Sequence, residues 1–563
     1  MYKTSKGRRI LVILMSVVFI FALVGCTDKS EDEQTAEATK ASDATETTQD
    51  TSTEQAQEPD TKYMFGDEIQ EISVLTADMG LEVSFAEAKI IEIWEEATGV
   101  HVNWDLPASD DFSTVFQTRI VAGADIPDLF YIEGDGQDLV SDGVIANLTE
   151  YNIDELMPNY IGILESLGIR ASVTSPNGNM YVFPNYINAT GQKNVYSLDI
   201  RLDWLEALGM QEPTDWDEFK TYLEAVRDND MNGNGDATDE VPLTGLWLGP
   251  DVVKVFMTAY DLHFQYSAGY YPDENGVIVC EWISDNFKDC LKLAKEYYDE
   301  GLLTQSFASA DGDERTAQIL NNQVGAFNTV NYNAHNSVNI ALSDSVGDED
   351  AILFPMIPLK SYASGEPQGR GGDCSGVLIN ITYGISSVSD NIELVMKWLD
   401  YVGYSEEGIM LNAFGIEGET FEYVDGVPTL LDSIVNSENG KNYEMRSRGF
   451  YHINMPYVWP TVHHMQVLNS FPERLTERVT DIVDNYSTLV PNFPTVLSSE
   501  EEAEIIADAN GDLETYKDEM ILKFILGDVG IDEGWSEYVQ TLKNLGIDEV
   551  TAVKQAQYDR SLE

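Results

Sequence analysis

The sequence predicts an α/β protein built from two lobes, and three observations support this prediction. Strand-like runs and amphipathic helix-like runs alternate along the chain from Glu71 onward. The chain has 563 residues, which is more than a single hydrophobic core organises, so at least two lobes are expected. It contains only four cysteines, so disulfides are not expected to hold the fold together.

The first block of the chain is a β-α-β-α-β succession. The expected strands and helices, in chain order, are 72–75, 85–97, 101–104, 112–122 and 128–132. Trp94 lies on the apolar face of the first of these helices, so it is expected in the core. The succession predicts an open, mainly parallel sheet that binds its ligand at the carboxyl ends of the strands.

A second block begins with two helices. Residues 203–209 form a helix closed by glycine, and a second helix is expected to open with Thr214 as its N-cap and Asp217 at the N3 position. Later in this block, Cys280 ends a strand-like run and Cys290 lies on the following helix. We expect these two cysteines to be buried thiols, and a disulfide between them is the alternative.

The N-terminus carries a targeting segment. Four basic residues precede an apolar run at residues 10–24, which is too short for a membrane span. The run ends in Leu23-Val24-Gly25-Cys26, which resembles the bacterial lipobox, where a diacylglycerol is attached to the cysteine before cleavage ahead of it. We therefore expect a lipoprotein anchored through Cys26, with acyl chains such as palmitate, on the extracytoplasmic face of the membrane. An ordinary cleaved signal is the alternative.

Residues 27–62 are expected to form a disordered acidic tether. They contain no aromatic residue, and 11 acids against 3 lysines give a net charge of −8. Such a segment cannot bury enough apolar surface to offset the entropy lost on ordering. After residue 25 no run is long and apolar enough to cross a bilayer.

The charge of the chain excludes some partners. It carries 98 acidic against 32 basic side chains, a formal net charge of −66. A negative field of this size repels nucleic-acid phosphates and does not steer anionic substrates toward the protein. A neutral ligand such as a sugar is unaffected, and a cationic one is favoured.

Several segments together resemble one protein family. The segments are 203–210 followed by Glu-Pro-Thr-Asp-Trp-Asp-Glu-Phe, 232–235 with 239–243, 302–307 with 319–327, 354–358, 398–401 with 405–408, and 414–418 with 423–426. Their order resembles the extracellular solute-binding proteins of carbohydrate ABC importers, of the family 1 type and its Gram-positive lipoprotein branch. The resemblance extends from about residue 70 to residue 560.

The resemblance implies a two-lobed, periplasmic-binding-protein-like α/β fold that closes on a ligand between its lobes. The expected first lobe is 63–190 plus 373–450, and the second is 191–372 plus 451–563. The implied function is capture of a sugar or oligosaccharide and its delivery to the permease subunits of an ABC importer, by a monomer that is not an enzyme. A surface glycoside hydrolase is the alternative, as is a binding protein for peptides, for cationic solutes or for a membrane sensor.

No motif of the chain favours the enzymatic alternative. A glycosidase needs two carboxylates, but among 98 acids a pair of carboxylates carries no information. The sequence has no Gly-x-Ser-x-Gly elbow and no phosphate-binding glycine loop, and residues 372–376 place serine in the wrong position for such an elbow.

Residues 228–239 match the spacing of an EF-hand-type calcium loop. Oxygen donors occupy loop positions 1, 3, 5, 9 and 12, position 7 offers a backbone carbonyl, and position 6 is glycine. The expected ligands of a structural Ca²⁺ are Asp228, Asp230, Asn232, Asn234, Asp236 and Asp239. Glu240 is an alternative carboxylate, because an EF-hand has glutamate where Asp239 stands. The other interpretation of the segment is a polar turn without metal. No organic cofactor is expected.

The candidate ligand-binding residues lie where strands are expected to end. Sugar recognition uses aromatic faces together with carboxylates or amides. The candidates are Tyr131, Glu133, Trp247, Asn331, Tyr332, Asp373, Tyr457 and Trp459. The alternative for each of them is a core aromatic or a solvated turn residue.

Overall fold

The computed structural model of the chain describes most of residues 64–562. The positions not described are 67, 79, 81–82, 124, 133–135, 189–192, 264–268, 331–336, 349, 368, 374–375, 436, 438–440, 451–454, 457, 461–472 and 491–495. The targeting segment, Cys26 and the acidic tether lie outside the described residues. In the described part of the chain, no helix combines the length and apolarity that a membrane crossing requires.

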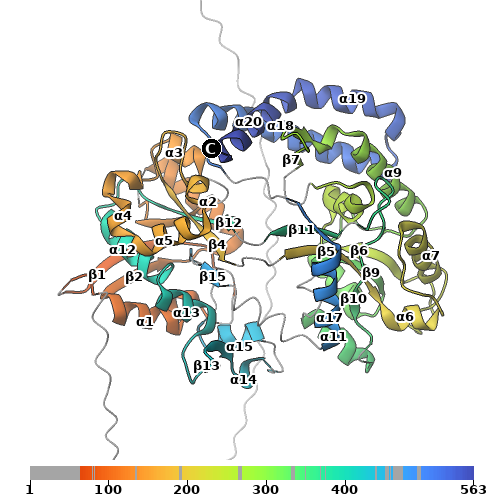
Figure 1. Ribbon diagram of the computed structural model, residues 1–563, viewed down its shortest axis with the longest axis horizontal. Coiled ribbons are helices and arrows are strands. Elements are labelled where there is room, and N and C mark those ends of the chain that lie inside the picture. The colour runs from red at the N-terminus through yellow and green to blue at the C-terminus, as the bar shows by residue number, and fades with distance from the viewer. Residues whose placement is uncertain are drawn as a thin grey trace, which may run out of the picture. The chain divides into compact units, whose positions relative to one another are not determined.

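The first of two six-stranded sheets contains most of the N-terminal strands (Figure 1). Its order is β15 (Val458–Pro460), β4 (Val182–Asn188), β12 (Gly376–Ile385), β3 (Leu129–Ile132), β1 (Gln70–Leu75) and β2 (Val100–Asp105). The β1 strand pairs in parallel with β2 and with β3. The β-α-β-α-β succession expected from the sequence is therefore confirmed.

Helices cover the first sheet and complete its core. The α1 helix (Lys89–Thr98) presents Trp94, which is 2% exposed and makes an edge contact of 6.0 Å with Trp398 of α12 (Ile392–Val402). Gly99 ends α1 with a φ of 68°, a left-handed conformation that favours glycine. The other helices of this part are η2 (Phe85–Glu87), α2 (Ser109–Ala122), α3 (Gln137–Ser141), η3 (Leu148–Tyr151), α4 (Ile153–Leu156), α5 (Pro158–Leu167), η4 (Arg170–Val173) and α13 (Glu406–Phe414).

The second six-stranded sheet has a core of its own. Its order is β16 (Ser487–Val490), β11 (Gly369–Asp373), β5 (Lys193–Arg201), β9 (Val324–Val330) and β6 (Val241–Gly245), and β10 (Leu353–Pro355) also pairs with β5. The helices of this part are α6 (Leu202–Ala207), α7 (Trp216–Arg227), η5 (Gly249–Tyr260), η6 (Glu281–Ile283), α9 (Asp285–Asp299), α10 (Gly312–Leu320), α11 (Ser337–Val346), α17 (Glu473–Asp481) and the π-helical η8 (Ile482–Tyr486).

The C-terminal helices belong to the core of the second sheet. They are α18 (Glu500–Leu526), α19 (Ile531–Asn544) and α20 (Ile547–Ser561), and α18 and α19 lie beside α9 (Figure 1). Phe524 and Tyr538 are fully buried and belong to the same hydrophobic cluster as Phe287 of α9. Smaller elements of the chain are the hairpins β7 (Tyr270–Pro272) with β8 (Ile278–Cys280) and β13 (Phe421–Val424) with β14 (Val427–Leu430), and the helices α14 (Asp432–Val435) and α15 (Lys441–Ser447).

The sheets are mixed, which corrects the expectation that they are mainly parallel. The β5 strand runs antiparallel to β9, β10 and β11, and β12 runs antiparallel to β3 and β4. The β4 strand of the first sheet precedes β5 of the second, and β11 of the second precedes β12 of the first. A strand that arrives from the other sheet needs no βαβ crossover, so nothing forces it to be parallel to its neighbours.

Two boundaries differ from those expected. The β15 strand pairs with β4 in the first sheet, although the second lobe was expected to begin at residue 451. The α7 helix begins at Trp216 with Asp215 as its N-cap, which accepts the backbone N–H of Glu218 at 2.9 Å. Thr214, the expected N-cap, instead donates its hydroxyl to Glu218 at 2.9 Å. The cap is displaced by one residue because both residues have the short oxygen-bearing side chain that caps use.

Candidate functional site

Polar and aromatic side chains meet where β1 and β3 of the first sheet end. The Thr76 hydroxyl, directly after β1, lies 2.7 Å from the Tyr383 hydroxyl of β12, and these residues are 3% and 0% exposed. Burial raises the pKa of Tyr383 well above its usual value. The Tyr131 ring on β3 lies 5.7 Å from the Tyr383 ring and 5.3 Å from the Phe112 ring. Tyr131 therefore keeps part of its surface exposed while it packs against two other rings.

Trp247 lies at the corresponding end of the second sheet. It follows β6 by two residues and is half-buried. The Lys254 ammonium of η5 lies 5.9 Å from the centre of its ring. The parallel strands β6 and β9 end at the same edge of the sheet, and in a mixed α/β sheet this carboxyl edge is where ligands bind.

Buried polar groups line β5 and β9 behind this edge. Asp199 is 1% exposed and accepts the Ser197 hydroxyl at 2.6 Å. Burial raises the pKa of Asp199 to about 8, and the Ser197 hydrogen bond acts in the opposite direction. Asn328 donates its amide to the Ser197 carbonyl at 3.3 Å, while its Oδ1 atom is buried without a hydrogen-bond partner.

Two hollows of the second part of the chain do not suit a sugar. An enclosed cavity of about 20 Å³ is lined by Ser197, Lys254 and Asn328 among others, and this is room for one water molecule. A surface hollow of about 390 Å³ lies between α9 and α19. Its walls are charged side chains such as Lys292 and Asp532, which form an ion pair of 3.1 Å, so it offers no aromatic face.

The structure describes the side chains of only two predicted ligand-binding residues. These are Tyr131 and Trp247, one at the carboxyl edge of each sheet. For Asp373 on β11 and Trp459 on β15, only the backbone pairing with Lys193 and Ile187 is described. The other predicted residues lie outside the described positions, and they are Glu133, Asn331, Tyr332 and Tyr457.

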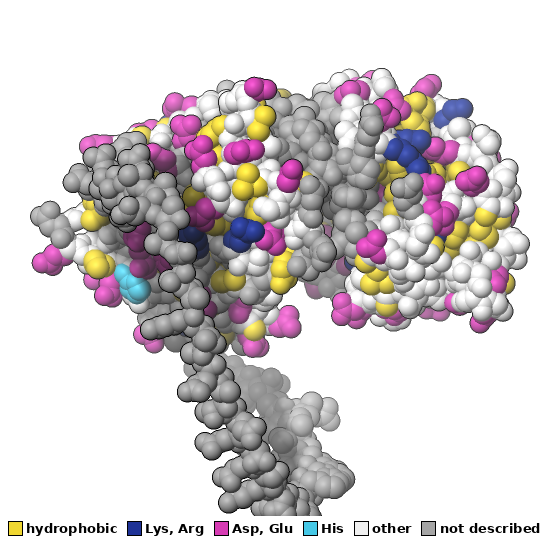
Figure 2. Space-filling view, turned by 90° about the horizontal axis from the view of Figure 1, so that it is seen from below, with side chains coloured by type: hydrophobic (Ala, Val, Ile, Leu, Met, Phe, Trp, Pro, Cys, Tyr) yellow, Lys and Arg dark blue, Asp and Glu magenta, His cyan; other side chains and the backbone are white. Residues whose placement is uncertain are grey.

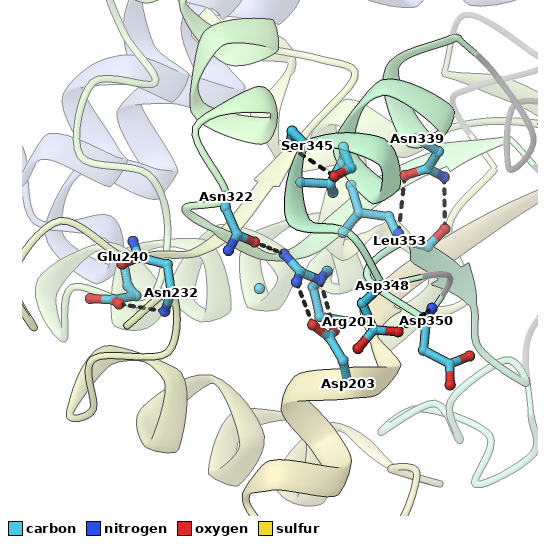
Figure 3. Close-up of polar contacts among 12 residues, drawn as sticks. Arg201, Asp203, Asn232, Glu240, Asn322, Asn339, Ser345, Asp348, Asp350 and Leu353 are labelled. Carbon is cyan, nitrogen blue, oxygen red and sulfur yellow. Dashed lines mark hydrogen bonds and ion pairs between the residues drawn. The ribbon is translucent and has the colours of Figure 1, made fainter. Parts of the chain in front are cut away.

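The predicted calcium loop is folded around Asp230. The Asp230 carboxylate accepts the backbone N–H groups of Asn234 at 3.1 Å and Gly235 at 2.8 Å. Glu240 Oε1 accepts the backbone N–H groups of Met231 at 2.7 Å and Asn232 at 3.3 Å (Figure 3). These bonds close a compact turn from residue 230 to residue 240, in which oxygen donors come from both ends.

The first of the predicted calcium ligands lies apart from this turn. The Asp228 carboxylate pairs with the Arg227 guanidinium at 2.7 Å, and this contact lowers the pKa of Asp228. At the other end, the Asp239 carboxylate accepts the side-chain amides of Asn234 at 2.8 Å and Gln323 at 3.0 Å. Asp236 is exposed, and its pKa is lowered by hydrogen bonds from Thr238. The expected spacing from Asp228 thus differs from the observed turn by two residues.

The turn has the chemistry of a site for a hard cation. Its side-chain donors are carboxylate and amide oxygens, which Ca²⁺ prefers. Glu240 Oε2 is buried without a hydrogen-bond partner, and a buried carboxylate oxygen is costly unless something pairs with it. Among the described residues, no group of three or more His, Cys, Asp or Glu side chains is placed to hold a metal ion. Amide and backbone oxygens would therefore have to complete the ligand set.

Cys280 and Cys290 are free thiols, as expected. They are 5% and 0% exposed. Burial raises the pKa of the Cys280 thiol to about 12 and that of Cys290 higher still. Cys374 lies outside the described residues. A structural disulfide between Cys280 and Cys290 is therefore absent, and each thiol packs as a small apolar group.

The exposed charge is overwhelmingly acidic. Figure 2 shows carboxylates spread over the visible face and few lysine or arginine side chains among them. Many of the described cations are already engaged in ion pairs, as Lys220 is with Glu296 and Glu300. On that face there is no basic patch of the kind that binds phosphates.

Two α/β sheets, each with its own core and each entered more than once by the chain, define the class of two-lobed binding proteins. The family described as bacterial extracellular solute-binding protein matches residues 77–408. The chain belongs to this family, and the resemblance expected from the sequence is confirmed.

Two curated relatives share the sequence. The fructooligosaccharide ABC transporter substrate-binding protein FusA of Streptococcus pneumoniae serotype 4 is 25% identical over 494 residues, which cover 84% of this chain and 87% of FusA. Lipoprotein LipO of Bacillus subtilis (strain 168) is 27% identical over 241 residues, which cover 41% of this chain and 45% of LipO.

Solved structures share the fold. Alginate-binding protein AlgQ2, in a structure without calcium ion, has a TM-score of 0.73 at 21% identity, and 88% of this chain covers 99% of that one. FusA of S. pneumoniae in complex with kestose has a TM-score of 0.71 at 24% identity with the same coverage. An EF-hand mutant of FusA in complex with fructo-nystose has a TM-score of 0.70 at 22% identity. The expected two-lobed α/β fold is therefore confirmed.

Proposed function

We propose that the protein captures a sugar or oligosaccharide outside the cell and delivers it to an ABC importer. The observation that carries this proposal is the similarity to FusA, whose name describes a fructooligosaccharide-binding component of an ABC transporter, along 84% of the chain. The acidic surface is consistent with a neutral ligand, because such a ligand is not repelled by negative charge. In this role the protein binds and releases its ligand unchanged.

The ligand is proposed to bind at the carboxyl edges of the two sheets. Trp247 offers a half-exposed aromatic ring at the end of β6, and Tyr131 offers part of its ring at the end of β3. Aromatic faces cover the C–H surfaces of sugar rings, while amides and carboxylates bind the hydroxyls. The remaining proposed contacts are Glu133, Asn331, Tyr332, Asp373, Tyr457 and Trp459.

The chain is further proposed to work as a monomer at the membrane surface. Its first lobe would be built on the first sheet, extended to include β15, and its second lobe on the second sheet with the C-terminal helices. Cys26 would carry the lipid, residues 27–62 would give reach, and the permease subunits would receive the closed form. The similarity to lipoprotein LipO supports the anchor.

We also propose that residues 230–240 bind a structural Ca²⁺. Asp230, Asn232, Asn234 and Glu240 would supply side-chain oxygens, and Asp236 and Asp239 are the further candidates. When bound, the ion would neutralise carboxylates that the turn brings together and would fix the start of β6, which follows Glu240 directly. The printed description of a FusA EF-hand mutant indicates that a relative has such a motif.

A thermal-shift screen of the full-length chain tests the function. Mono- and oligosaccharides would be compared with peptides and polyamines, and each mixture would be analysed for product by mass spectrometry. A ligand at about 100 times its dissociation constant stabilises a protein by about 2.7 kcal/mol. A shift with one sugar class and no product supports the proposal. A shift with peptides or polyamines alone, or any product formation, contradicts it.

Substitution of the proposed aromatic contact gives a sharper test. Trp247→Ala is expected to weaken sugar binding at least tenfold without changing the secondary structure. Tyr423→Ala is the matched control, because Tyr423 is 51% exposed on the β13–β14 hairpin, away from both carboxyl edges. Equal affinities of the two variants in calorimetry would remove Trp247 from the site.

A further inference from the structure

Arg315 binds the backbone at the end of β6. It lies on α10, is half-buried, and its Nη1 atom donates to the carbonyl of Leu246 at 2.8 Å. The carbonyl of Gly245 lies 3.5 Å from the same atom. The β6 strand is at the edge of its sheet, so at this end an arginine supplies a donor that no further strand provides.

Arg315 differs from most other arginines of the chain. In this strongly acidic protein, arginine side chains commonly pair with carboxylates. Eight of them do so: Arg119, Arg170, Arg201, Arg227, Arg448, Arg474, Arg478 and Arg560. Among the described residues, Arg315 forms no ion pair with a carboxylate, and burial lowers its pKa. The cost of burying this cation is offset by the backbone contact rather than by an opposite charge.

The contact fixes one end of a short loop. The Leu246 backbone N–H donates to the Asn328 carbonyl of β9 at 2.8 Å, so both polar groups of the Leu246 backbone are bound. The other end is fixed at Gly249, whose N–H donates to the Phe307 carbonyl at 2.7 Å. Trp247 and Leu248 are the residues between these two fixed points.

We infer that Arg315 is a positioning residue for ligand binding, which holds Trp247 in its binding orientation by fixing the Leu246 carbonyl. This inference rests on the proposed function, because it takes Trp247 as a ligand contact. Arg315 itself need not touch the ligand. Its planar guanidinium presents several donors in a fixed fork, so it can hold two neighbouring carbonyls, whereas a lysine ammonium is a flexible point charge and holds them less well.

The inference is tested on the full-length chain with three arginine variants. Arg315→Met removes the donors while keeping an unbranched apolar stem, and Arg315→Lys keeps one donor group and the charge. Arg448→Met is the matched control, because it removes an arginine from the exposed pair with Glu444 on the first-sheet side. Backbone hydrogen exchange of residues 244–249 is measured without ligand. Affinity and dissociation rate are then measured with the sugar that the thermal-shift screen identifies.

The expected result is a graded loss at one place. Arg315→Met should speed exchange in residues 244–249 and weaken sugar binding at least tenfold, mainly through faster dissociation. Arg315→Lys should lie between wild type and Arg315→Met, and Arg448→Met should match wild type. In a Trp247→Ala background, Arg315→Met should change the affinity less than twofold, because its effect acts through Trp247.

Other results overturn the inference in distinguishable ways. Unchanged exchange in residues 244–249 would show that Arg315 does not fix the loop. A lower melting temperature with unchanged affinity would leave it a purely structural residue. A tenfold loss that persists in the Trp247→Ala background would mean that Arg315 contacts the ligand directly. If no sugar binds the wild type, the proposed function fails, while the exchange measurement still decides whether Arg315 fixes the loop.

Discussion

Ser197 donates a hydrogen bond of 2.6 Å to Asp199, two residues further along β5, and the two residues are 4% and 1% exposed. Burial of the carboxyl raises the pKa of Asp199 to about 8 despite this bond. The folded protein therefore holds Asp199 protonated at neutral pH, whereas the unfolded chain releases this proton near its ordinary pKa of about 4.

Asp199→Asn is expected to remove one component of the pH dependence of stability. Because the folded pKa is raised, the contribution of Asp199 is fully present below the unfolded pKa and is lost as pH rises toward 8. Relative to the variant, the wild-type unfolding free energy should fall by at most about 1.4 kcal/mol per pH unit in this window. Urea unfolding from pH 5 to pH 8 measures the difference. The exposed Asp512→Asn is the control for lost charge, and parallel curves for wild type and Asp199→Asn would contradict the prediction.

Calcium binding should distinguish Asp228 from Asp230. Asp230→Asn and Glu240→Gln are expected to weaken Ca²⁺ binding at least tenfold, because each removes a charged oxygen from the turn. Asp228→Asn should bind Ca²⁺ like the wild type, because Asp228 pairs with Arg227. The measurement is the difference in melting temperature between calcium and chelator, together with calorimetric titration. A loss of affinity in Asp228→Asn alone would restore the spacing expected from the sequence.

The ion pair of Arg201 and Asp203 should stabilise the second sheet. The Arg201 side chain is 0% exposed, and its Nε atom donates to Asp203 at 2.8 Å (Figure 3). Asp203→Asn leaves a buried cation without its opposite charge, so the unfolding free energy should fall by about 3 kcal/mol. Glu519→Gln breaks the exposed pair with Lys523 and should cost about 0.5 kcal/mol or less. Similar losses for both variants in urea unfolding would contradict this view of Arg201.

The two buried thiols should be inert in the folded protein. With the pKa of Cys280 raised to about 12 by burial, almost no thiolate is present at neutral pH. An alkylating reagent should therefore modify Cys280 and Cys290 only after unfolding, as peptide mass spectrometry would show. A reductant should leave the melting contribution of this region unchanged. Rapid labelling of either peptide under native conditions would mean that the α9 region opens.

The regular elements of the first sheet could be predicted from the sequence because their cause is local. The run at 72–75 and the helical periodicity around Trp94 appear in the structure as β1 and α1 within a few residues. The directions of β5 and β12 could not be predicted in this way. They follow from where the chain arrives from, which depends on pairing with strands that are remote in sequence.

The candidate site was less predictable, for similar reasons. Tyr131 was chosen because it ends a strand, but its packing against Phe112 and Tyr383 depends on α2 and β12. The calcium loop was recognised from its composition, yet repeated Asp and Asn residues allow two spacings, and only the bonds of Asp230 and Glu240 separate them. Arg315 carried no sequence signal, because a lone arginine on a helix does not reveal which carbonyl it will meet.

The interleaving of the two sheets has a consequence for how an exported chain acquires its structure. The first sheet joins β4 directly to β12 and to β15, so it cannot be completed until residue 460 is available. The second sheet needs β16, which ends at Val490. Neither half can therefore finish folding behind the other during export, and both must close late and almost together. Removal of the last hundred residues would leave two incomplete sheets rather than one intact lobe.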